Sequence, residues 1–320
     1  MIAAGVSAFF LYLTLRGAQL DEVAKHLLGV NLAILSLTIV TKGTGFVFMA
    51  LRARVLFGPI HDYRFGEMFK AILVGFAGNN LLPFRAGELL KVGYLSRVGR
   101  TSPSTCLAVV VTERLIDTFC MLLLFLAATP LAVVEVENTL ALALTASVVV
   151  GAVGFVIMVA RYPEVFIGLA ERGVRPLGAA AADKLTPLMN RFIGGLAALR
   201  SARAVATVML LSLGTWAMWL TGIRIWMWAF DLHLPWYAPL VVVSFVAFGS
   251  FLPSAPSGVG TYHYFCSRAF SLMGVGPHLA TSLAFVGHAA STLPWTLISL
   301  AVLLVELARN GWPTPATAEG

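Results

Sequence analysis

Gly75-Phe-Ala-Gly-Asn-Asn-Leu-Leu-Pro-Phe-Arg-Ala-Gly-Glu88 breaks one apolar run of this chain, and Ala247-Phe-Gly-Ser-Phe-Leu-Pro-Ser-Ala-Pro-Ser-Gly-Val-Gly260 breaks another. Each run stops at Leu-Pro, passes through small polar residues and Gly, and resumes as a helix-like stretch. In a soluble protein the two stretches would be loops. In a membrane protein, paired segments interrupted by Gly and Pro in the two halves of the chain point to a transport site.

The composition indicates a membrane protein. Hydrophobic residues make up 59% of the chain and charged residues only 12%, whereas soluble domains carry about 25% charged residues. Several apolar runs reach the roughly 20 residues that a helix needs to span a bilayer. These runs lie within 30–41, 117–134, 139–160, 204–223, 238–252 and 295–305. Cys106, Cys120 and Cys266 lie in apolar stretches, where thiols act as small hydrophobes, and they form no zinc or disulfide pattern.

The net charge of +7 is placed unevenly along the chain. Basic residues gather in an expected loop with Arg52, Arg54 and Arg64, in a second with Arg97 and Arg100, in 161–203, and at Arg309. The positive-inside rule places these segments and both termini in the cytoplasm. Nucleic-acid binding is the less economical interpretation, because basic residues beside membrane spans are attracted to anionic lipid headgroups.

The sequence predicts an all-α polytopic protein with one integral membrane domain over 1–320. Full spans are expected at 1–15, 29–51, 103–132, 138–160, 204–230 and 278–306. The start of the chain lacks a basic region and an Ala-x-Ala cleavage site, so we interpret it as a span and not as a signal peptide. The broken segments, 68–98 and 237–273, are expected to be re-entrant hairpins that open to opposite sides. A first repeat over 29–132 and a second over 204–308 would then have inverted topology.

An arrangement in which either broken segment crosses the membrane fully stays open. Outside the repeats, we expect a first helix and an outer loop in 1–28, a connecting helix and a cytoplasmic linker in 133–203, and a tail in 309–320. Apolar residues at helical spacing in 185–199 predict one or two amphipathic helices on the membrane surface.

Charged and amide side chains surround the first break. Arg85, Glu88 and Lys91 repeat every three residues, so they share a helix face. Asn79, Asn80 and Pro83 mark the break itself, where freed backbone groups need new partners. A helix that begins near Phe84 would point its positive end at an anionic headgroup, with Arg85 as a bidentate partner. A simple ion-pair network at the membrane edge is an equally good interpretation.

Glu113, Arg114 and Asp117 lie inside the expected span 103–132. Glu113 and Asp117 are four residues apart on one helix face, and two unpaired carboxylates at that depth would be unfavourable. We expect them to pair with Arg85, Lys91 or Arg114 and to lock the first hairpin to its neighbour. A proton-coupled role is the second interpretation.

In the second half, Pro253, Ser254, Ser257, Gly258 and Gly260 build the break, and Tyr262, His263 and Arg268 follow it. A lone buried histidine is most often a hydrogen-bonded structural residue, and we favour that role for His263 over a titrating one. His288 is expected to line a cavity. The tryptophans of 216–236 are expected to serve as packing and interfacial anchors.

The sequence has no Gly-rich phosphate loop, no HExxH motif, no nucleophile elbow and no Cys/His metal spacing. We therefore expect a protein that is not an enzyme and that uses no cofactor and no metal.

Three motifs in this order resemble the flippase-like, lysylphosphatidylglycerol synthase transmembrane family. They are Asn79-Asn80-Leu-Leu-Pro83-Phe-Arg85-Ala-Gly87-Glu88-Leu-Leu-Lys91, then Glu113-Arg114-Leu-Ile-Asp117, then Pro253 with Pro256-Ser-Gly258-Val-Gly260. The likeness covers about 30–305. The resemblance implies a bacterial or archaeal cytoplasmic-membrane protein that moves lipids or lipid-linked precursors between leaflets, here expected without the synthase portion.

The chain departs from the family pattern twice. A glycine is expected where Ser257 stands, and an acidic residue where His263 stands. The second departure argues against a mechanism that relies on a carboxylate at that position.

We therefore expect a lipid flippase whose two hairpins enclose a polar cavity open sideways to lipid. The expected partner is a membrane lipid with an anionic headgroup and not a nucleic acid, and a homodimer is left open. Arg85 and Lys91 would hold the headgroup, and Arg268 and its neighbours would face them from the other half. The alternatives are an integral-membrane enzyme that acts on a lipid phosphate and a transporter or channel for small solutes.

Overall fold

The computed structural model describes residues 2–16, 19–82, 86–128, 161–174, 179–250, 252 and 254–311, with 147, 150–151, 154–155 and 157–159. The regular structure of these residues is helical, which confirms the all-α prediction. The α-helices are α1 (Ile2–Leu15), α2 (Leu20–Leu28), α3 (Leu32–Phe57), α4 (Phe65–Leu81), α5 (Gly87–Val98), α6 (Pro103–Ala128), α8 (Pro163–Val174), α9 (Ala179–Gly194), α10 (Ala202–Ala229), α11 (Ala238–Gly249), α12 (Thr261–Leu272) and α13 (Pro277–Asn310). Two 3₁₀ turns, η3 (Ala197–Arg200) and η4 (Pro256–Gly258), complete the set.

Three of the described helices, α3, α10 and α13, are long and apolar enough to cross a membrane. They coincide with the expected spans 29–51, 204–230 and 278–306. Of the other expected spans, 1–15 corresponds to the shorter apolar helix α1 and 103–132 to α6, which carries charged residues in its middle. Most of 138–160 lies outside the described residues.

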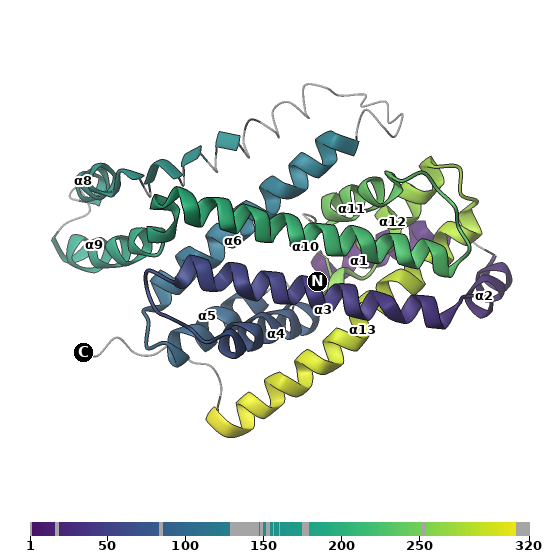
Figure 1. Cartoon of the computed structure of the whole chain (residues 1–320), viewed down its shortest axis with the longest axis horizontal. Helices are drawn as coiled ribbons and strands as arrows, with labels where there is room; N and C mark the ends of the chain where they lie inside the picture. The colour runs from purple at the N-terminus through teal and green to yellow at the C-terminus, as the bar shows by residue number, and fades with distance from the viewer. Residues whose placement is uncertain are drawn as a thin grey trace.

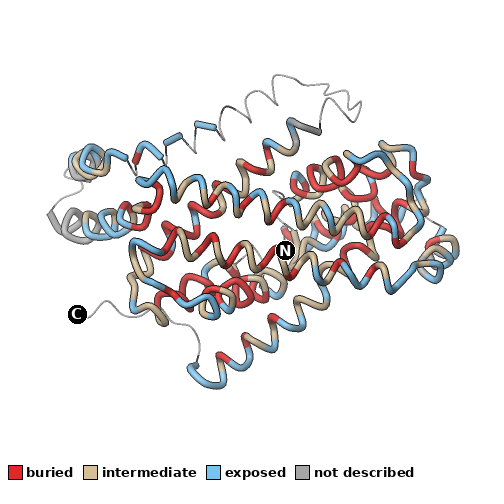
Figure 2. Tube along the Cα trace, viewed as in Figure 1, coloured by how far each residue is buried: buried red, intermediate tan, exposed pale blue. Residues whose placement is uncertain are grey.

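The longest contact between helices joins α3 to α10. The two helices run side by side along the molecule, with α8 and α9 near one end and α2 at the other (Figure 1). Many residues along α3, α10 and α13 are exposed (Figure 2). They include large apolar side chains such as Leu37, Leu210 and Leu297. Such surfaces suit a lipid environment.

Each broken segment folds as a helical hairpin. α4 packs against α5 across the first break, and α11 packs against α12 across the second. The two hairpins also meet, because α4 contacts η4, the turn between α11 and α12. The first break includes 83–85 and the second includes 251 and 253, which lie outside the described residues.

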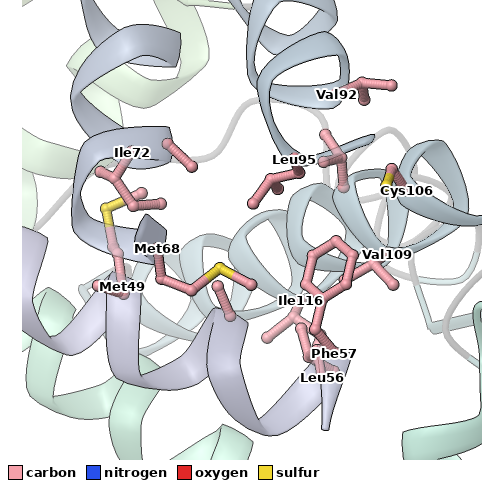
Figure 3. Packing of buried hydrophobic residues seen from close by; sticks show 14 of the residues in the cluster. Met49, Leu56, Phe57, Met68, Ile72, Val92, Leu95, Cys106, Val109 and Ile116 are labelled. Atoms are coloured by element: carbon pink, nitrogen blue, oxygen red, sulfur yellow. The ribbon is translucent and has the colours of Figure 1, made fainter. Parts of the chain in front are cut away.

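Each hairpin has its own apolar core. Buried side chains of α3, α4, α5 and α6 pack around the first, including Phe57, Met68 and Leu95 (Figure 3). A second cluster, with Met227, Phe270 and others, joins α10, α11, α12 and α13. The separation into halves is incomplete, because the first cluster also holds Val208, Trp216 and Leu303 of the second half and the second cluster holds Leu35 of the first.

Two connections differ from expectation. The expected outer loop in 16–28 contains α2, which has Asp21 and Glu22 in its first turn and Lys25 in its last, the charge order that favours a helix. α3 does not end near residue 51 but continues to Phe57, so Arg52 and Arg54 are helical. In the linker 161–203, the helices α8 and α9 form as expected and pack on each other.

The first hairpin depends on close backbone contact at Gly87. A Cβ atom at this position would lie far inside van der Waals distance of the Gly75 carbonyl oxygen and the Asn79 amide. We predict that Gly87→Ala destabilises the fold by about 1–3 kcal/mol, because backbone atoms cannot move aside as side chains do. A lower thermal unfolding temperature in detergent would report the loss.

Gly66→Ala is the matched control on the same hairpin. A Cβ at Gly66 meets nothing within 4 Å. This variant should keep its unfolding temperature or gain up to about 1 kcal/mol from higher helix propensity. Equal unfolding temperatures for the two variants would contradict the tight α4–α5 contact.

Candidate functional site: a polar cavity between two broken hairpins

A cavity of about 700 Å³ is lined by residues from both hairpins and from the helices that pack on them. The first half of the chain contributes Thr38, Thr41 and Lys42 from α3, Asn79 and Asn80 from α4, and Glu88, Arg114 and Asp117 from α5 and α6. The second half contributes Ser254, Ser257, Gly258, Tyr262 and His288. The sequence analysis named all of these except the three α3 residues.

Other expected site residues lie elsewhere. Lys91 and Glu113 are buried away from the cavity lining, and Gly260 and His263 are buried behind it. Arg268 is exposed on α12 and does not line the cavity, which corrects the expectation that it faces the first half. Pro83, Arg85 and Pro253 lie outside the described residues.

A network of ion pairs closes the cavity on the side of the first hairpin. Arg52 on α3 forms a bidentate pair with Asp117, whose second contact joins Arg52 Nη2 to Asp117 Oδ2 at 3.2 Å. Arg114 Nη2 lies 2.9 Å from the same Oδ2, and Arg114 Nη1 lies 3.6 Å from Glu88 Oε1. Asn79 donates to Glu88 Oε1 at 3.3 Å. The network thus ties α3, α4, α5 and α6 together.

A separate ion pair lies deeper. Lys91 Nζ pairs with Glu113 Oε2, and both side chains are almost fully buried. Glu113 therefore has one of the partners expected from the sequence. The Lys91 side chain has little exposed surface and does not line the cavity, so its ammonium group is not available to bind a headgroup there. This corrects the expectation for Lys91.

Arg52 is the partner that sequence reasoning missed. It was assigned to a cytoplasmic loop, yet its side chain is fully buried and also donates to Ser212 Oγ on α10 at 3.1 Å. The sequence did carry a signal, because no Gly or Pro separates Arg52 from the apolar stretch 46–51 that precedes it. Helix continuation to Phe57 brings the two together.

The second hairpin supplies hydroxyl and backbone groups, and α13 supplies an imidazole beside them. His288 Nε2 lies 3.0 Å from the Ser257 carbonyl oxygen and 3.3 Å from Ser257 Oγ, and the His288 ring stacks on Tyr262. His263 Nδ1 accepts the Gly260 amide N–H at 3.2 Å, and its ring stacks on Phe285. This geometry matches the structural role favoured for His263.

The turn at the second break needs left-handed backbone. Ser257, Gly258 and Gly260 have φ angles of 62°, 71° and 90°. Only glycine adopts this region without a steric penalty. This explains why the family pattern has a glycine at the position of Ser257. Gly260 also lies against the Ser7 carbonyl of α1, where a Cβ would clash.

Lys42 is the other residue that sequence reasoning missed. It lines the cavity, half-buried, and its Nζ lies 5.2 Å from the ring centroid of Trp219 and 5.6 Å from that of Phe76. A single lysine in the middle of the apolar run 32–51 was a visible signal, because charges inside membrane spans are usually functional. Trp216, Trp219 and Trp226, expected only as anchors, line the cavity as well.

Disruption of the Arg52–Asp117 pair should lower the stability of the fold. We predict that Arg52→Met lowers stability by about 3–5 kcal/mol, because it leaves a carboxylate in a poorly solvated position with less compensation. The double variant Arg52→Met/Asp117→Asn should lose less than the sum of the two single losses. Thermal unfolding of the four proteins measures the coupling, and strictly additive losses would contradict the pair.

The comparisons with known proteins place the chain in a family. The family described as "Lysylphosphatidylglycerol synthase TM region" matches residues 1–299. No curated protein matches the chain. The match contains all three motifs and nearly all of the stretch of about 30–305 over which the likeness was noted, and it confirms the resemblance.

Proposed function

This chain belongs to the lysylphosphatidylglycerol synthase transmembrane-region family, and from that premise we propose that it is a flippase-like lipid transporter of a bacterial or archaeal cytoplasmic membrane. The cavity takes up the anionic headgroup of a membrane lipid or lipid-linked precursor and passes it between leaflets, while the acyl or prenyl chains stay in the bilayer. No bond is made or broken, so the protein is not an enzyme in this proposal.

The observation that carries the proposal is the polar cavity inside an otherwise apolar helical body. Its lining draws side chains from both hairpins, including Glu88 and Ser257, and from the neighbouring helices α6 and α13, including Asp117 and His288. Its volume, about 700 Å³, lies within the range of roughly 300–1,000 Å³ typical of small-molecule sites. A headgroup fits such a space, whereas two acyl chains would remain outside.

Helix length supports half-membrane hairpins. α5, α11 and α12 each have 12 residues, so each is roughly 18 Å long at 1.5 Å per residue, and α4 has 17 residues, roughly 26 Å. All four are shorter than the roughly 30 Å hydrocarbon core, three of them by a wide margin. In the proposed topology, six spans flank two re-entrant hairpins in an inverted repeat, and both termini are cytoplasmic.

Occlusion of the cavity tests the proposal. Ala290 on α13 lines the cavity. We predict that Ala290→Trp slows exchange of a fluorescent phosphatidylglycerol between leaflets about tenfold or more, because overpacking of even 1–3 kcal/mol in the occupied state changes a rate by that order. Exchange is measured in proteoliposomes by the fraction of probe that a membrane-impermeant reductant quenches.

The neighbouring Ala289→Trp is the matched control, since Ala289 is exposed and does not line the cavity. It should exchange lipid at the wild-type rate. The proposal fails if wild-type proteoliposomes match protein-free liposomes, with or without an imposed proton gradient or membrane potential. A covalently altered lipid, detected by mass spectrometry after incubation, would instead favour an enzyme.

A further inference from the structure

We infer that Lys42 is the residue that binds the anionic group of the ligand and thereby sets the charge selectivity of the cavity. Only one part of this inference rests on the proposed function, namely that the ligand is a lipid. The chemistry recognised is a phosphodiester anion.

The first argument is the depth of Lys42 in the membrane. α3 has 26 residues and is roughly 39 Å long, and Lys42 lies ten residues after its start, roughly 15 Å along the axis. A span of this length crosses a hydrocarbon core of roughly 30 Å, so Lys42 lies near the middle of the core. A charge at that depth usually has a partner or serves a transported ligand.

The second argument is charge balance. Among the described residues, Lys42 and Arg114 are the lysine and arginine side chains that line the cavity. Arg114 is paired with Asp117 and Glu88, and Arg52 is paired with Asp117, so the network has two cations and two carboxylates. The separate pair of Lys91 and Glu113 is balanced as well. Within the same described residues, no carboxylate lies within 4.0 Å of the Lys42 ammonium. The network is balanced, and Lys42 adds a positive charge to the cavity.

The third argument is the environment of the ammonium. The rings of Phe46, Phe76 and Trp219 surround Lys42 Nζ at centroid distances of 5.8, 5.6 and 5.2 Å. Aromatic faces stabilise a cation and hold it in place, but they do not neutralise it. In a poorly solvated cavity the attraction to a phosphodiester is stronger than in water.

These aromatic faces also argue against a cationic ligand. A group of rings of this kind could bind a quaternary ammonium headgroup, but Lys42 occupies it. A ligand that carries an amine would meet a like charge there. The cavity therefore favours an anionic headgroup with neutral hydroxyl groups over a zwitterionic one.

A binding experiment on the full chain in detergent tests the inference. The probes are dioctanoyl phosphatidylglycerol, dioctanoyl phosphatidylcholine and the tail-free glycerophosphoglycerol. The wild type should bind the first most tightly. Lys42→Gln should weaken its binding about tenfold, as expected for loss of one charge-assisted contact, and leave phosphatidylcholine binding unchanged. Lys42→Arg should keep most of the affinity, and Lys25→Gln, which removes an exposed lysine of α2, should keep all of it.

Lys42→Met is the control for misfolding of the Lys42 variants. It removes a desolvated ammonium that has no carboxylate partner among the described residues, so it should unfold at a temperature equal to or above that of the wild type. Met and Gln should weaken phosphatidylglycerol binding alike. Wild-type affinity and selectivity in both folded variants would overturn the inference.

The outcomes separate this inference from the proposed function. Lys42-dependent binding of phosphatidylglycerol without lipid exchange by the wild type would support the anion site and contradict transport. Equal, Lys42-dependent binding of glycerophosphoglycerol would support the anion site and assign it to a soluble phosphodiester. Lipid exchange whose headgroup preference is the same in Lys42→Gln would uphold transport and overturn the role of Lys42.

Discussion

The arrangement depends on one constraint: charges inside an apolar body must be compensated where they lie. Arg52, Glu88, Arg114 and Asp117 satisfy it across three helices, and Lys91 with Glu113 satisfies it beside them. Removal of any member would leave an opposite charge in a medium that solvates it poorly. The network therefore fixes how α3, α5 and α6 approach one another, and with them the first hairpin. Among the residues that the structure describes, the positive and negative charges of this network are equal in number, so Lys42 adds a net positive charge to the cavity.

The two hairpins are related in form but differ in chemistry. The first hairpin, with α6 beside it, presents paired charges and amides to the cavity, whereas the second presents hydroxyl groups. Ser257 of its turn bonds to the imidazole of His288 on α13. A headgroup between them would meet a cation and hydrogen-bonding groups on opposite sides. The contact of α4 with η4 brings these two surfaces together at the breaks.

Much of this arrangement could be predicted from the sequence. The Leu-Pro interruptions and the glycines after them located both breaks, because few other residues permit the close approach at Gly87 or the left-handed turn at Gly258. The positions of Asn79, Glu88 and Ser257 near one cavity followed from the same breaks. The membrane topology of the hairpins stays a prediction, since a protein alone defines no bilayer.

The errors have related physical causes. Hydropathy shows which segments are apolar, but it shows neither where a helix ends nor how the helix is rotated about its axis. Arg52 was therefore assigned to a loop although it pairs with Asp117 from inside α3, and Arg268 was assigned to the cavity although it is exposed. Lys42 was overlooked because its partners, the rings of Phe76 and Trp219, come from α4 and α10, far away in the chain.

A cryo-electron microscopy map of the wild type in phosphatidylglycerol nanodiscs tests the central claim most directly. We expect density for a two-tailed lipid whose phosphate lies within about 4 Å of Lys42 Nζ, the reach of an ion pair, with its chains extending sideways into the bilayer. A map in which the hairpins lie apart, or in which apolar side chains fill the space between them and every lipid stays outside, would contradict it.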